Sequence, residues 1–301
     1  MQSRSIVRGY ACIIASAVIF GCMPLLSKYI YADGVNSITL VLLRSALSLP
    51  ILVVLALVRH EQIRLPIKDA ASVMAVGIVG CALTPLLLLS SYNYISGGTA
   101  TVLHFVYPAV VLVLELILVR SRVKYGSVIG ILLCIGGIAL FYDPAEAISL
   151  TGSALALLSG VSNAVYIVLL SRLGSRGAGE YTFAFYASLS ASAMLLVVCL
   201  ASNSLALPTT LGGWLLCVLF SLLINVGAVV LFQVGTFIIG GQKASILSTF
   251  EPITSLGVDY FAFGINAGTL SVVGSALIIS ASVLIAVLDG KEKKNEKQNL
   301  N

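Results

Sequence analysis

Five charged side chains fall within long apolar segments of this 301-residue sequence: Lys28, Arg44, Glu115, Glu251 and Asp259. Charge inside a lipid bilayer is costly unless it faces a cavity, an ionic partner or the membrane surface. A carboxylate in a cavity binds an ammonium group or a proton, and a guanidinium binds a carboxylate or a phosphate. The depth of each charge within its segment therefore indicates which of them could act on a substrate.

Glu251 is the acid that lies deepest in its segment, about 10 Å from one end at a helical rise of 1.5 Å per residue. It precedes Pro252, which lacks a backbone N–H and loosens a helix. One interpretation is a cavity carboxylate that binds a substrate ammonium group or a competing proton. The other is a neutral Glu251 that makes an interhelical hydrogen bond beside a proline bend. The sequence leaves both open.

Arg44 is the deepest base, about 10 Å inside its own segment. It either binds an anionic substrate or serves the structure, by reaching the membrane surface or by pairing with Asp259, which has a compatible depth. The other charges have simpler interpretations. Lys28 lies near a segment end and is expected to reach the surface. Glu115 is expected to pair with the arginines that follow it, and Asp259 can also be a solvated segment end.

Uncharged polar side chains gather at similar depth in four of the apolar segments. In one of them Ser159, Asn163 and Tyr166 are spaced four and three residues apart, which places them on one helix face. Such residues also serve helix packing, so it is their convergence that points to a site. The candidate substrate-binding residues are Glu251, Asn163, Tyr166, Asn225, Tyr107, His104, Ser248 and Arg44.

Ten apolar segments must position these residues, and a helix needs about 20 residues to cross a bilayer. The segments are residues 9–30, 37–58, 70–93, 97–119, 125–142, 152–171, 181–202, 212–236, 244–263 and 269–288. Bends are expected at Pro24, Pro85, Pro108 and Pro252. Charged residues make up only 10% of the chain, against roughly 25% in soluble domains. The composition predicts an all-α integral membrane protein and argues against a soluble enzyme.

The basic residues indicate how the chain crosses the membrane. With a cytoplasmic N-terminus, fifteen of the 17 Lys and Arg residues fall in cytoplasmic segments and none falls in an outer loop. Cytoplasmic loops of membrane proteins carry such an excess of positive residues. The sequence therefore predicts an even number of spans with both termini in the cytoplasm. Orientation also accounts for the net charge of +5, without a nucleic-acid partner.

The two halves of the chain resemble each other at an offset of 144 residues. Gly97–Glu115 aligns with Gly241–Asp259, and Pro108 thereby meets Pro252. Five spans are an odd number, so the second copy enters the membrane in the opposite sense. Inverted repeats are typical of secondary transporters, which bind substrate between the halves near the midplane. The predicted units are a five-helix repeat over residues 1–145, a second over 146–290, and a basic cytoplasmic tail over 291–301.

The inverted 5+5 arrangement, Leu43-Arg44 and Phe250-Glu251-Pro252 resemble the EamA group of the drug/metabolite transporter superfamily over residues 9–288. The resemblance implies transport of small metabolites, often export of amino acids or related compounds. It also implies a cavity formed mainly by spans 1, 3, 4, 6, 8 and 9. The first copy departs from the pattern, because it has Tyr107-Pro108 where many members have Glu-Pro.

The leading prediction is a multi-pass secondary transporter of the plasma or inner membrane, which moves a small polar metabolite by alternating access. It is expected to export amino acids or related amines, with protons as a further candidate ligand. One alternative is import or exchange of an anionic or phosphorylated metabolite bound by Arg44.

A different class of function is a non-transporting scaffold or an intramembrane enzyme. We assign no catalytic residue, because His60 and His104 lie at different depths and no nucleophile–base motif is present. The six cysteines form no CxxC pair and the glycines form no nucleotide-binding motif. We therefore expect no enzyme activity, metal or cofactor, and only a small-molecule substrate and the bilayer as partners.

Overall fold

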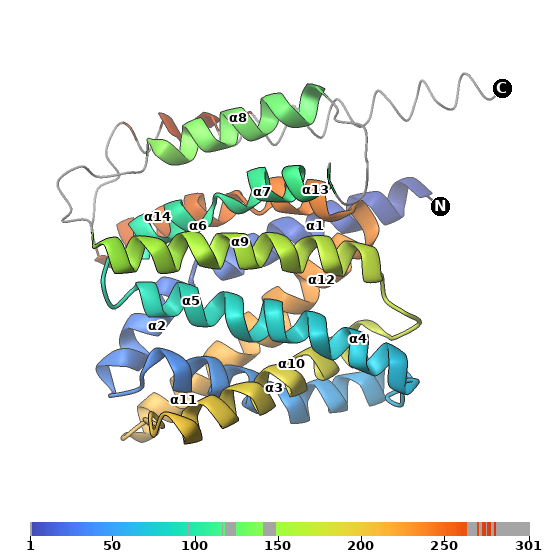
Figure 1. The fold of residues 1–301 in the computed structure, drawn as a ribbon, viewed down its shortest axis with the longest axis vertical. Coiled ribbons are helices and arrows are strands. Elements are labelled where there is room, and N and C mark those ends of the chain that lie inside the picture. The colour runs from blue at the N-terminus through green and yellow to red at the C-terminus, as the bar shows by residue number, and fades with distance from the viewer. Residues whose placement is uncertain are drawn as a thin grey trace.

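The computed structural model describes residues 2–95, 97–115, 117, 125–140 and 149–263, together with single positions between 270 and 280. Its described elements are helices that lie side by side along one common direction (Figure 1). Among the described residues, six helical segments are long and apolar enough to cross a membrane: Ile6–Ala32, Ser37–Val58, Ile67–Ser91, Leu150–Leu173, Glu180–Ala201 and Leu211–Ile239. They coincide with six of the ten predicted spans, within three residues at each end.

The first half contains α1 (Gln2–Phe20), α2 (Met23–Ala32), α3 (Ser37–Val58), α4 (Ile67–Gly77), the π-helical segment η1 (Ile78–Leu83), α5 (Thr84–Ser91), α6 (Gly97–His104), α7 (Tyr107–Leu114) and α8 (Tyr125–Ala139). The second half contains α9 (Leu150–Leu173), α10 (Glu180–Ala201), α11 (Leu211–Phe220), the π-helical segment η3 (Ser221–Val229), α12 (Val230–Ile239), α13 (Gly241–Leu247) and α14 (Phe250–Phe263). The predicted tenth span, residues 269–288, lies outside the described residues apart from the single positions.

The four expected proline bends are confirmed. The chain breaks between α1 and α2 just before Pro24, and between α6 and α7 and between α13 and α14 next to Pro108 and Pro252. Before Pro85 the helix widens into η1, where the Thr84 hydroxyl donates to the Val79 carbonyl at 2.9 Å. Hydroxyl side chains thus satisfy backbone groups that a bend frees inside a membrane.

The helix contacts have the pattern of two halves related by a two-fold axis. Helix α3 packs against its counterpart α10. Helix α7 packs against α13 and, equivalently, α14 packs against α6. Helix α1 packs against α12 and, equivalently, α9 packs against α5. Each half thus offers the same surface to the other, as in a self-complementary dimer interface.

Two polar contacts show that the halves are inverted relative to each other. The Thr182 N–H donates to Glu61, and the Thr39 hydroxyl donates to the Ser204 carbonyl. Glu61 and Ser204 are 143 residues apart, and so are Thr39 and Thr182. Thr39 lies in the first turn of α3, whereas Glu61 follows the end of α3, so the two equivalent contacts lie at opposite ends of the bundle.

Glycines allow the closest helix contacts. A side-chain carbon on Gly77 of α4 would lie 2.5 Å from the Cα of Ala187 in α10. A side-chain carbon on Gly160 of α9 would lie 2.4 Å from the backbone carbonyl oxygen of His104, at the end of α6. Small residues at such crossings let helix backbones approach each other in membranes. These contacts fix the distances of α10 and α6 from their neighbours.

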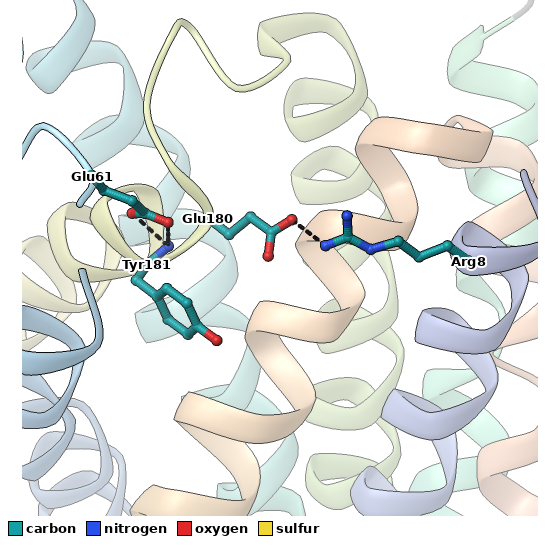
Figure 2. A network of polar contacts seen from close by, with 4 residues as sticks. All are labelled: Arg8, Glu61, Glu180 and Tyr181. Carbon is teal, nitrogen blue, oxygen red and sulfur yellow. Dashed lines mark hydrogen bonds and ion pairs between the residues drawn. The ribbon is translucent and has the colours of Figure 1, made fainter. Parts of the chain in front are cut away.

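Ionic contacts join the helices at the end of the bundle where α1 begins (Figure 2). Arg8 Nη2 of α1 donates to Glu180 Oε1 at the start of α10, at 2.6 Å. Glu61 accepts hydrogen bonds from the backbone N–H groups of Tyr181 at 3.1 Å and Thr182 at 2.8 Å. A carboxylate at a helix N-terminus is favourable, because the first N–H groups of a helix lack internal partners. The contacts thereby tie α1 and the end of α3 to α10.

Asp33 makes a similar contact at the opposite end, where α2 meets α11. Its carboxylate accepts from the Thr210 hydroxyl at 2.8 Å and from the Thr209 N–H at 2.9 Å. These hydrogen bonds hold the pKa of Asp33 below its ordinary value, and the bond from the Thr210 side chain has the largest effect. Asp33 therefore stays charged and holds the start of α11.

Candidate functional site

The two broken helices place four side chains around the middle of the bundle. His104 and Tyr107 flank the α6–α7 break, and Ser248 and Glu251 flank the α13–α14 break. The two sets are 144 residues apart. Pro252 offers no N–H to the Ser248 carbonyl, and the Glu251 N–H binds that carbonyl at 2.9 Å instead. The break thus turns the start of α14, and with it Glu251, toward the neighbouring helices.

A partly open cavity lies between these breaks and the neighbouring helices, with about 630 Å³ of empty space including its mouth. Seven of the eight predicted binding residues line it: Arg44, His104, Tyr107, Asn163, Tyr166, Ser248 and Glu251. They come from α3, α6, α7, α9, the turn after α13, and α14. The structure therefore brings together groups from four of the predicted spans, although their binding role itself stays a prediction.

Equivalent positions of both halves form the cavity wall. Phe20 and Asn163 are 143 residues apart, Met23 and Tyr166 are also 143 residues apart, and all four line the cavity. In the sequence, Asn163 and Tyr166 stand out as polar residues of an apolar segment, whereas their apolar counterparts do not. The repeat offset was the signal that could have found Phe20 and Met23. Other apolar wall residues, such as Phe232, carry no signal that separates them from lipid-facing residues.

Glu251 is partly accessible and contributes a carboxylate to the cavity wall. Within the described part of the chain, no basic side chain pairs with Glu251 and no side chain donates a hydrogen bond to its carboxylate. An unpaired carboxylate at membrane depth is costly. The interpretation of Glu251 as a partner in an interhelical hydrogen bond therefore has no contact to support it among the described residues.

His104 is held in one orientation by α9. Its Nδ1 lies 2.8 Å from Ser159 Oγ, which also lies 2.6 Å from the Ala156 carbonyl oxygen. Because a carbonyl can only accept, the hydroxyl proton points to Ala156, and His104 Nδ1 is the donor to Ser159. The Nε2 atom of the neutral ring is then an acceptor, with Asn163 Nδ2 at 3.5 Å. His104 and Asn163 thus combine packing with a place in the cavity wall.

Arg44 is a buried base whose donors are poorly used. Its side chain is only 2% exposed, and Nη2 donates to the Cys81 carbonyl at a long 3.4 Å. The Nε–H has no hydrogen-bond partner within the described residues. The predicted pairing of Arg44 with Asp259 stays a prediction, because the Asp259 side chain lies outside the described residues.

Both halves of the chain match one known protein family. Residues 7–142 and residues 150–287 each match the EamA-like transporter family. The chain belongs to this family. It is therefore a membrane transporter of the drug/metabolite transporter superfamily and a multi-pass protein of the inner membrane, with six helical segments in the described part of the chain long and apolar enough to cross a bilayer.

Relatives of this EamA transporter carry names of the same kind. The chain is 26% identical to the uncharacterized inner membrane transporter YicL of Salmonella typhimurium over 295 residues, which are 95% of this chain and 97% of YicL. It is 28% identical over 213 residues to an uncharacterized transporter of Archaeoglobus fulgidus, across 69% of this chain and 75% of the relative. A solved crystal structure aligns over 96% of this chain and 98% of its own, with a TM-score of 0.75 and 18% identity. That likeness shows a shared fold.

Asn225 is the predicted residue that the EamA fold places outside the cavity wall. It is fully buried in η3, and its Nδ2 donates to Ser48 of α3 at 2.7 Å and to Ser188 of α10 at 2.9 Å. These bonds join three helices of the bundle. We therefore assign Asn225 to helix packing, for which interhelical amide bonds are well suited, and leave it out of the proposed site.

Tyr166 lies where α9 meets η1 of the EamA bundle. Gln233 Nε2 donates to its hydroxyl at 3.3 Å, and its ring fills the space beside Gly80, where any side-chain carbon would overlap it. The described residues contain no group of three His, Cys, Asp or Glu side chains that could hold a metal ion. What the cavity offers to a ligand is one carboxylate, one guanidinium, and polar groups on α6, α9 and the turn after α13.

Proposed function

We propose that this EamA transporter is a secondary transporter of small polar metabolites that carry an amine, and that it exports amino acids or related amines. The observation that carries the proposal is the Glu251 carboxylate, which faces the cavity and has no charged or hydrogen-bonded partner among the described residues. An ammonium group of a substrate would supply the missing counter-charge. A proton would neutralise the same carboxylate when the cavity is empty, which would couple transport to protons.

The two-fold arrangement of the halves supports alternating access as the mechanism. Transporters with inverted repeats bind substrate near the midplane and open to each side by rocking one part against the other. Here the cavity walls combine equivalent positions of both halves, such as Met23 and Tyr166. The equivalent contacts Thr182–Glu61 and Thr39–Ser204 lie at opposite ends of the bundle. If one contact breaks while the other is kept, the cavity would open at one end and stay closed at the other.

We further propose ten spans with both termini in the cytoplasm, on the basis of the basic residues. The loop between α9 and α10 would then be cytoplasmic, and the loop between α10 and α11 external. Each contains an exposed position, Ser175 and Leu207. In a cysteine-free background, a membrane-impermeant maleimide should label Leu207→Cys on intact cells and Ser175→Cys only after lysis. The reverse pattern would contradict this orientation.

Transport itself is tested in liposomes that contain the purified protein. Liposomes loaded with a single unlabelled amino acid or amine should take up the same labelled compound by exchange, for at least one member of a panel of the twenty protein amino acids and their amines. Liposomes without protein control for leakage. The proposal would be wrong if no member of the panel entered faster than it enters empty liposomes.

Binding of an anionic or phosphorylated metabolite by Arg44 is the second candidate function, and the unpaired Nε–H of Arg44 favours it. However, Glu251 lines the same cavity. A purely anionic ligand would leave the carboxylate unpaired and would be repelled by it. An anion that exchanges across the liposomes, where no amino acid or amine does, would favour this candidate over the first.

A further inference from the structure

Two opposite charges line one cavity without an ion pair between them. Arg44 belongs to α3 and Glu251 to α14, and both contribute to the same cavity wall. Neither takes part in an ion pair within the described part of the chain. Each charge alone is costly at this depth. A ligand that carries both a negative and a positive group would satisfy the two at once.

The donors of Arg44 suit a carboxylate. A guanidinium offers five N–H donors in a flat fork that matches two carboxylate oxygens. In this structure the Nη2 contact with the Cys81 carbonyl is long, at 3.4 Å, and Nε–H is buried without a partner. Arg44 is thus held in place at 2% exposure with unused donors, whereas a purely structural arginine would have them satisfied.

The wall that contains Glu251 offers acceptors instead. The His104 Nε2 atom is an acceptor, because Ser159 fixes the ring proton on Nδ1. Asn163 Nδ2 is the donor to this atom, at 3.5 Å, and the amide oxygen of Asn163 is a further acceptor of the residues that line the cavity. An ammonium group has three donors and no acceptor, as a lysine side chain does. The Glu251 carboxylate and the Asn163 amide oxygen are acceptors of the kind that such a group requires.

We propose that Arg44 binds the carboxylate of the substrate while Glu251 binds its ammonium group, so that the cavity selects zwitterionic amino acids over amines and over simple acids. The inference rests on the proposed function, because it assigns the ammonium end to Glu251. Its new content is the role of Arg44 in specificity. An amine without a carboxyl group leaves Arg44 unpaired, and an acid without an amino group leaves Glu251 unpaired. Because an unpaired buried charge is costly, the cavity should bind both of these ligands more weakly than an amino acid.

The first test uses the unaltered protein in liposomes. The amino acid that exchanges best is compared, as a competitor, with the amine that lacks its carboxyl group and with the acid that lacks its amino group. We expect both analogues to compete at least about tenfold more weakly than the amino acid, since a hydrogen bond to a charged group contributes about 1.5–3 kcal/mol. Equal competition by the amine would overturn the inference while the proposed function would stand. If no amino acid or amine exchanges, both fail.

The second test uses Arg44→Gln and Arg44→Lys. Arg44→Gln should weaken competition by the amino acid at least about tenfold and leave competition by the amine unchanged, so that the preference disappears. Arg44→Lys keeps the charge without the flat fork, and should restore part of the preference. Lys28→Gln, which removes an exposed base outside the cavity wall, should keep the full preference. A purely structural role of Arg44 would instead weaken competition by both ligands equally, or by neither.

Discussion

Replacement of Glu251 by glutamine is expected to lower the initial rate of amino acid exchange in liposomes by at least about tenfold. Glutamine has nearly the same shape but cannot balance an ammonium group, and a charge-assisted hydrogen bond contributes about 1.5–3 kcal/mol, or roughly 10- to 150-fold. The expected loss is large because Glu251 has no other charged partner among the described residues that could take over. Exchange rates of wild type and variant at equal protein content provide the measurement.

The matched control for this variant is Glu296→Gln, which makes the same chemical change outside the segments that match the EamA family. It should exchange amino acids at the wild-type rate. Size-exclusion profiles and thermal unfolding in detergent should show that Glu251→Gln folds. A folded Glu251→Gln protein with wild-type rates would exclude the cavity carboxylate as a ligand and favour a role of Glu251 in the helix break alone.

Replacement of Gly160 by alanine is expected to destabilise the protein by about 1–3 kcal/mol or more, the usual cost of an overpacked contact. The new methyl group would lie 2.4 Å from the His104 carbonyl oxygen and 2.8 Å from a side-chain carbon of Val106. Backbone at a helix break cannot rotate away as a flexible side chain can. Helix α6 would have to move from α9, which would also strain the bond between His104 and Ser159.

Thermal unfolding in detergent measures this loss of stability, and Gly136→Ala is the control. Gly136 lies in α8, where nothing approaches within 4 Å of the position of a new side-chain carbon. Alanine in a helix interior is favoured over glycine by about 0.5–1 kcal/mol, so this variant should be as stable as wild type or more stable. If Gly160→Ala unfolds at the same temperature as Gly136→Ala, the close approach of α6 to α9 is not important for stability.

The sequence predicted the membrane environment and the depth of the cavity residues well. Spans such as 37–58 agree with the helices because an apolar run of sufficient length has only one stable form in a bilayer, a helix with all its backbone groups bonded. Depth follows from a fixed rise per residue. Arg44 and Glu251, which were identified by their depth, both line the cavity. Pro108 and Pro252 marked the broken helices, because proline removes a backbone donor in any helix.

Depth alone could not decide which way a side chain faces. Asn225 lies in η3 and was grouped with Glu251 by depth, yet it bonds to Ser48 and Ser188 between three helices. Phe20 lines the cavity although it is as apolar as any lipid-facing residue. Which side of a helix faces the cavity depends on contacts with helices that are distant in sequence. In a soluble protein a polar stripe marks the outer side of a helix, but a membrane helix that is apolar on all sides has no such stripe.

The sequence by itself therefore determined that this chain is a membrane protein of the EamA type, where its helices bend, and how deep its charges lie. Each of these depends on the apolar length, the rise of a helix or the chemistry of one residue. Only the tertiary structure decided that Arg44 and Glu251 share a cavity without an ion pair between them, and that Ser159 and Asn163 are the partners of the two His104 nitrogens. Those properties depend on contacts between helices, which close approaches such as that of Gly160 to His104 fix in space.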